Sequence, residues 1–149
     1  TGRKVVLAFA GDHAPSFVDH VADKTRTEGN DLQILERSTP FFIWAKYPLE
    51  NIDAATSTAD PLNRMDMVML APTIAQQAGL PLTGYYKYLL AMKQQTPVVT
   101  AANDYMKVDG TTGTYGEDES LDAWVKGYLA LEYNNIGAHA KHVQSIFGQ

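Results

Sequence analysis

The chain has 149 residues, of which 45% are hydrophobic and 19% charged, with a formal net charge of -5. These values are typical of a soluble globular protein, so we expect residues 1–149 to form one domain with a substantial core. The acidic balance, without a long basic run, argues against nucleic acid or an anionic membrane surface as a partner. The absence of cysteine excludes disulfides, thiolate metal sites and cysteine nucleophiles.

The first predicted element is a strand over residues 5–9, an unbroken apolar run that favours β-structure. Such a run predicts a strand buried on both faces within the parallel sheet of an α/β domain. Gly11 permits a turn directly after it, so Asp12 and His13 are expected at the carboxyl end of the strand, where such sheets bind ligands. An adjacent carboxylate and imidazole suit a divalent cation such as Mn²⁺ or Zn²⁺. The alternative is an ordinary turn followed by a histidine.

The next predicted elements are a short helix and a second strand. Ser16 can cap a helix over residues 17–22, and the polar residues 24–31 read as a loop. Residues 38–45 form a second β-like run, in which Pro40 suits the first position of a strand because its missing N–H costs least there.

Two helices are predicted in the middle of the chain. From Met67 the apolar positions have helical spacing and Gly79 ends the helix, while Pro72 either lies in the first turn or kinks the helix. Thr83 caps the second helix. Core packing is favoured over ligand binding for the methionines and tyrosines of this region, which are Met65, Met67, Met69, Tyr85, Tyr86 and Tyr88.

The last third of the chain predicts a strand, a turn-rich loop and a helix. Residues 96–102 form the strand, and residues 109–116 read as a loop or the tip of a hairpin. The acidic residues 117–119 stand directly ahead of the helix, where negative charge is favourable, so they are interpreted as a cap and not as a metal-binding cluster. Apolar residues within 121–131 recur with a period of 3.6.

Three further histidines are assigned no role in a site. His20 is interpreted as a solvent-facing or helix-end residue. His139 and His142 are three residues apart, which suits metal ligation on a helix, but no carboxylate is spaced with them. A solvated tail is therefore the favoured interpretation of the segment that carries them.

Taken together, several motifs in this order resemble one protein family. They are Ala10-Gly11-Asp12-His13-Ala14-Pro15, Thr39-Pro40-Phe41-Phe42-Ile43-Trp44, Ala78-Gly79-Leu80-Pro81, Tyr85-Tyr86-Lys87-Tyr88-Leu89, Thr96-Pro97-Val98, and Glu132-Tyr133 to Gly137. Each motif is loose by itself, but the ordered set resembles the lipoteichoic acid synthase and phosphoglycerol transferase group of the sulfatase-like, alkaline-phosphatase superfamily. One departure is Lys46, where the family often has asparagine.

The resemblance implies an α/β fold, with the chain as the C-terminal portion of a sulfatase-like sheet with flanking helices. It assigns Asp12 and His13 as two ligands of a catalytic divalent metal, with Mn²⁺ favoured and Mg²⁺ or Zn²⁺ as alternatives. The family's threonine nucleophile and a further carboxylate ligand lie upstream of these motifs, so no catalytic nucleophile is assigned within residues 1–149. The resemblance implies one metal and not two, because a second site commonly uses a histidine before the Thr-Pro motif, where this chain offers only Glu36.

The implied activity is the transfer of glycerol phosphate from phosphatidylglycerol to a cell-envelope polymer or glycolipid, by a membrane-anchored enzyme that acts on the extracellular side. The alternatives are a sulfatase or phosphoethanolamine transferase of the same superfamily, or a non-catalytic module that binds an envelope component. We expect the chain alone to be inactive, to hold metal weakly and to self-associate, because the opening strand would lack neighbours.

Overall fold

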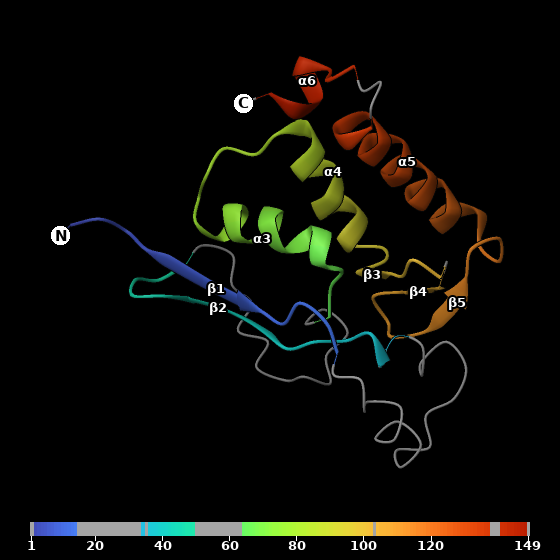
Figure 1. The fold of residues 1–149 in the computed structure, drawn as a ribbon, viewed down its shortest axis with the longest axis horizontal. Helices are drawn as coiled ribbons and strands as arrows, with labels where there is room; N and C mark the ends of the chain where they lie inside the picture. Colours follow the sequence, from blue (N-terminus) through green and yellow to red (C-terminus); the bar gives the residue numbers. More distant parts are fainter. Residues whose placement is uncertain are drawn as a thin grey trace, which may run out of the picture.

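The computed structural model describes residues 2–14, 34, 36–49, 64–102, 104–137 and 141–148. These residues form a mixed α/β protein with two small antiparallel sheets and four α-helices (Figure 1). The expected helix over residues 17–22, the loop over residues 24–31, His20 and His139 lie outside the described residues.

The first sheet is a two-stranded ribbon of β1 (Val6–Ala10) and β2 (Phe41–Ala45). The strands run antiparallel, with Ala8 opposite Ile43 at the centre. Both strands alternate between half-buried and exposed residues. The prediction of a strand buried on both faces of a parallel sheet is therefore wrong. Its apolar run forms the expected strand, but the partner strand is antiparallel and one face of the ribbon is open to solvent.

The helix predicted from Met67 is confirmed. A 3₁₀ turn, η2 (Met67–Met69), leads directly into α3 (Leu70–Gln77). Pro72 lies in the first turn of α3, where its missing N–H has no helical acceptor to lose. Gly79 adopts a φ of 67°, a left-handed conformation that glycine reaches without a steric penalty, and ends the helix as predicted.

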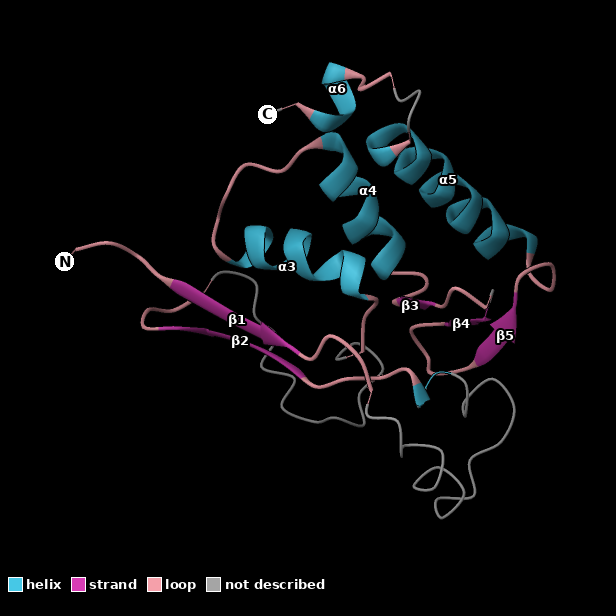
Figure 2. Ribbon diagram, in the orientation of Figure 1, coloured by secondary structure: helices cyan, strands magenta, loops and turns pink. Residues whose placement is uncertain are grey.

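The helix predicted after Thr83 is α4 (Gly84–Lys93), and its cap is also confirmed. The Thr83 hydroxyl oxygen accepts the Tyr86 N–H at 3.1 Å. The short α6 (Gln144–Phe147) lies against the start of α4 (Figure 2). The rings of Tyr85 and Phe147 are 5.6 Å apart at this contact. A Cβ at Gly84 would stand 3.0 Å from the Ile146 Cα, so glycine permits this close approach.

The second sheet has three short antiparallel strands, β3 (Val98–Val99), β4 (Asp104–Met106) and β5 (Thr112–Thr114). The hairpin tip anticipated within residues 109–116 lies between β4 and β5, with Gly110 at a φ of 86°. The strand predicted over 96–102 is shortened to β3. The Thr96 side chain, which precedes β3, donates its hydroxyl to the Met106 carbonyl at 3.0 Å.

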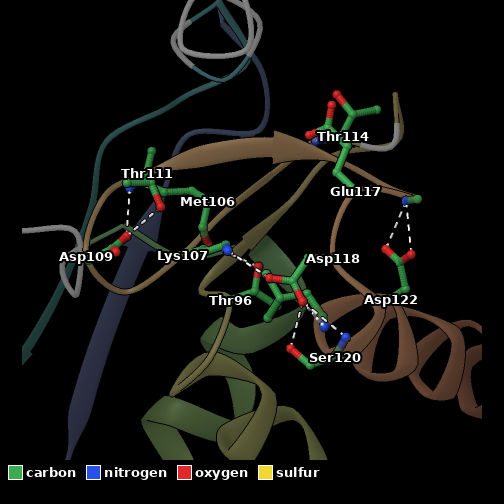
Figure 3. A network of polar contacts seen from close by, with 12 residues as sticks. Thr96, Met106, Lys107, Asp109, Thr111, Thr114, Glu117, Asp118, Ser120 and Asp122 are labelled. Carbon is green, nitrogen blue, oxygen red and sulfur yellow. Dashed lines mark hydrogen bonds and ion pairs between the residues drawn. The ribbon is translucent and has the colours of Figure 1, made fainter.

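The longest helix, α5 (Glu119–Ile136), begins at the acidic segment that the sequence predicts as a cap. Figure 3 shows the Asp118 carboxylate accepting hydrogen bonds from the N-terminus of α5 while it pairs with Lys107. The Lys107 Nζ to Asp118 Oδ2 distance is 2.8 Å, and this hydrogen bond holds the pKa of Asp118 well below its usual value. The cap therefore joins the hairpin to α5.

The core lies between the helices, where Met69, Leu89, Met92, Val125 and Tyr128 form one buried cluster. Met65 packs against this cluster, whereas Met67 is half exposed, so core packing is confirmed for two of the three methionines. Within the described residues, the helices are too short or too polar to cross a bilayer.

Candidate functional site

The segment that carries Asp12 and His13 is held against the start of β2. Gly11 donates its N–H to the Pro40 carbonyl at 3.0 Å, continuing the antiparallel pairing by one step. The Thr39 hydroxyl donates to the Gly11 carbonyl at 2.9 Å. The Gly-Asp-His and Thr-Pro motifs, which are far apart in the sequence, are therefore in direct contact.

Close packing requires glycine at position 11. A Cβ built there would lie 2.9 Å from the Thr39 Cβ, closer than real Cβ atoms approach. The φ of Gly11 is not positive, so the requirement comes from the approach of the Thr39 side chain and not from a left-handed turn. The two hydrogen bonds and this contact fix where the next two side chains begin.

The donor atoms of Asp12 and His13 are oriented by the local backbone. Asp12 Oδ1 accepts the N–H of His13 at 3.0 Å, which leaves Oδ2 for other contacts. His13 Nδ1 lies 3.1 Å from the Ala14 carbonyl oxygen. Because a carbonyl oxygen only accepts, Nδ1 carries the hydrogen in this contact, and Nε2 is the lone-pair nitrogen of the neutral ring. A backbone carbonyl orients many metal-binding imidazoles in this way.

The remaining donors fit one divalent cation. His13 Nε2 and Asp12 Oδ2 are 3.6 Å apart. Ligand distances of about 2.0–2.2 Å allow two donors of one ion to be separated by up to roughly 4.3 Å. The His13 and Asp12 side chains are 80% and 89% exposed, so further ligands have space to approach. A site of this kind commonly needs four ligands, and the described residues contain no group of three or more histidines and acidic residues suited to a metal.

The other candidate groups do not join this pair in the described part of the chain. Glu36, the acidic residue three positions before Thr39, is half buried and belongs to no metal-binding group in the described part of the chain. His142 is exposed, and its ring packs edge-on against Phe147 with centroids 5.6 Å apart. The structure thus brings together Asp12 and His13 and leaves Glu36 and His142 outside the pair.

Two of the tyrosines that were weighed as ligand-stacking residues pack within the fold. Tyr88 donates its hydroxyl to the Trp124 carbonyl at 2.7 Å, and the two rings lie 5.2 Å apart. Tyr85 packs on Phe147. The packing interpretation is confirmed for this pair.

A polar cluster beside the core was missed by the sequence interpretation. Tyr128 donates its hydroxyl to Glu132 Oε1 at 2.8 Å, and burial is the main cause that raises the pKa of Tyr128. Asp66 accepts the Val68 N–H and caps η2, while burial raises its pKa, with the Glu132 charge adding to the effect. An aspartate one position before the first helical residue is the sequence signal that would have identified this cap.

The contribution of Thr39 was also missed, although the Thr-Pro motif itself was noted. Its hydroxyl holds the Gly11 carbonyl, so Thr39 is a positioning residue for the Asp12 and His13 pair.

Comparisons of the chain with protein-family models, with curated proteins and with solved structures found no match.

Proposed function

We propose that the chain supplies two metal ligands, Asp12 and His13, to a metal-dependent phosphotransferase. The proposed enzyme moves glycerol phosphate from phosphatidylglycerol to a cell-envelope polymer or glycolipid, on the extracellular side of the membrane. The observation that carries the proposal is the 3.6 Å separation of His13 Nε2 and Asp12 Oδ2 on a turn held by Thr39. The choice of reaction comes from the resemblance of the ordered motifs.

Each residue of the turn has a separate role in this proposal. Asp12 contributes a negative oxygen donor, and His13 contributes a neutral nitrogen donor whose ring is oriented by the Ala14 carbonyl. Mn²⁺ accepts such a mixed oxygen and nitrogen set, and Mg²⁺ or Zn²⁺ are the alternatives. When bound, the cation neutralises charge that develops on the phosphoryl oxygens. Thr39 holds the backbone directly before both donors through its bond to the Gly11 carbonyl.

The proposal requires a nucleophilic hydroxyl and further metal ligands, and none of these groups is assigned within residues 1–149. By resemblance these groups lie on polypeptide that precedes the Gly-Asp-His motif. The direct test therefore uses the complete natural protein that contains this sequence, in vesicles of phosphatidylglycerol with Mn²⁺ and a glycolipid acceptor. The readouts are diacylglycerol release and phosphorus incorporated into the acceptor.

We expect Asp12→Asn and His13→Ala each to reduce turnover to background, because each removes a ligand, while circular dichroism and the unfolding midpoint stay unchanged. His142→Ala is the matched control, since it removes another exposed histidine, and it should retain full turnover. Turnover near the wild-type level in Asp12→Asn or His13→Ala would refute the assignment. Metal analysis of the active protein should give about one equivalent, and a reproducible value near two would refute the single-metal prediction.

Substrate alternatives are separated in the same experiment. The protein could instead hydrolyse a sulfate ester or transfer a group from phosphatidylethanolamine. Either result would leave the assignment of Asp12 and His13 as metal ligands standing but would refute the proposed transfer of glycerol phosphate. Absence of any turnover, with metal still bound through Asp12, would favour a binding module.

A further inference from the structure

The β1–β2 ribbon exposes one apolar face. Leu7 and Phe9 of β1 stand opposite Trp44 and Phe42 of β2, and all four side chains are about half exposed. Val5, one step before β1, adds a fifth exposed apolar side chain. The rings of Phe9 and Phe42 stack across the two strands with centroids 5.4 Å apart, so these two side chains form one continuous apolar surface. We call these five residues the ribbon face.

The ribbon face is large enough to bind a partner but too small for an obligate complex. A fully buried aromatic side chain covers about 150–250 Å², so three half-exposed aromatics with Leu7 and Val5 offer roughly 450 Å². Two such faces in contact would bury roughly 900 Å², close to the lower limit of about 1,000 Å² for a biological interface. This area fits a weak, reversible dimer.

Charges at the two ends of the ribbon distinguish between the possible orientations of two copies. Arg3 and Lys4 precede β1, and Lys46 follows β2 at the same end, since Val6 pairs with Ala45. Asp12 lies at the opposite end, just beyond Ala10. Glu36 and Arg37 precede β2 at this end, and their opposite charges offset each other, so Asp12 leaves the end acidic. Stacked sheets are about 10 Å apart, a distance over which charges still interact at physiological salt. An antiparallel arrangement places each basic end over the acidic end of the other copy, whereas a parallel one superposes the basic ends.

We propose that the ribbon face binds a second copy of this chain, face to face, with the two ribbons antiparallel about a two-fold axis. The interaction is isologous, because the same five side chains contribute from each copy. It does not rest on the proposed catalytic role, because the five side chains of the ribbon face include neither Asp12 nor His13. The charge of Asp12 acts at the rim in the metal-free chain. We expect a dissociation constant on the order of tens of micromolar, as fits an interface of this size.

Sedimentation and light scattering of the 149-residue chain from 5 to 500 µM test the dimer. The face variant is Leu7→Gln with Trp44→Gln. The matched control is Leu129→Gln with Tyr133→Gln on α5, since Leu129 and Leu7 are both 52% exposed and Tyr133 is likewise exposed. We expect the face variant to raise the dissociation constant at least tenfold and the control to change it less than twofold. Phe9→Thr alone should also weaken the dimer and serves if the double variant does not fold.

A monomer throughout this range, or a face variant that dimerises like the wild type, would overturn the proposal. An equal weakening of the dimer in the α5 control would also overturn the proposal, because the loss of affinity would then not be specific to the ribbon face. Orientation is tested with a nitroxide at Val5→Cys, a unique label because the chain has no other cysteine. Val5 lies three residues from the centre of the face, so antiparallel ribbons place the two labels roughly 20–25 Å apart. A separation of roughly 10–15 Å would overturn the antiparallel arrangement.

Discussion

The helices and the β1–β2 ribbon use similar side chains with opposite results. Leu89 on α4 is 1% exposed, whereas Leu7 on β1 is 52% exposed. Leu89 is covered because η2, α4 and α5 contribute to a shared cluster, while within the described residues the ribbon has no layer over its outer face. Apolar character therefore predicts which side chains can be buried, but the presence of a second layer decides which ones are. The candidate metal ligands lie in the less buried region.

The largest expected effect comes from equal truncations in the two regions. Leu89→Ala should lower the free energy of unfolding by about 2–5 kcal/mol, because it removes buried methyl groups and leaves a cavity. Leu7→Ala should change it by less than about 0.5 kcal/mol, as surface substitutions usually do. Urea unfolding below 5 µM, where the proposed dimer would be dissociated, provides the measurement. Equal losses from both substitutions would show that the ribbon face is covered in solution.

A smaller effect should follow from filling the space between Gly11 and Thr39. Gly11→Ala places a Cβ 2.9 Å from the Thr39 Cβ, and such overpacking typically costs about 1–3 kcal/mol. Gly2→Ala is the matched control, because a Cβ there meets nothing within 4 Å. We expect the Asp12 and His13 amide resonances to shift in Gly11→Ala alone. Unchanged resonances in that variant would show that Thr39 does not fix the turn.

The smallest effect concerns Asp66, the partly buried acid of the helical region. Burial raises its pKa above 3.8, so its stabilising contribution is fully present below pH 3.8 and is lost as the pH rises through the folded-state pKa. Asp66→Asn stays neutral and keeps an oxygen for the Val68 N–H. The variant should therefore gain stability relative to the wild type as the pH rises from 3.5 to 7, measured by urea unfolding. Parallel stability curves over this range would contradict the raised pKa.

The sequence was sufficient for local structure in the second half of the chain. Thr83, Gly79 and the acidic segment before α5 act through neighbours within a few residues, so their caps and stops were predictable. The β1 strand was predictable in position but not in pairing, because an apolar run has no signal for the direction of its partner. Likewise, the bond from Thr39 to Gly11 depends on how two distant segments pair, which spacing along the chain does not encode.

The candidate site was predictable as a pair of residues and not as a complete site. Asp12 and His13 are adjacent, so their proximity follows from the sequence alone. The direction of the His13 ring depends on its contact with the Ala14 carbonyl, and the open space around the pair depends on the tertiary arrangement. Further ligands cannot be found by local reasoning because they must approach from elsewhere.

The most direct test of the central claim, that Asp12 and His13 present two donors to one cation, is a Mn²⁺ titration of the ¹⁵N-labelled chain. Paramagnetic broadening should be centred on Asp12, His13 and Thr39, with binding weaker than micromolar because two ligands do not complete a site. The broadening should disappear in Asp12→Asn. Broadening centred elsewhere, or persisting at the turn in Asp12→Asn, would contradict the claim.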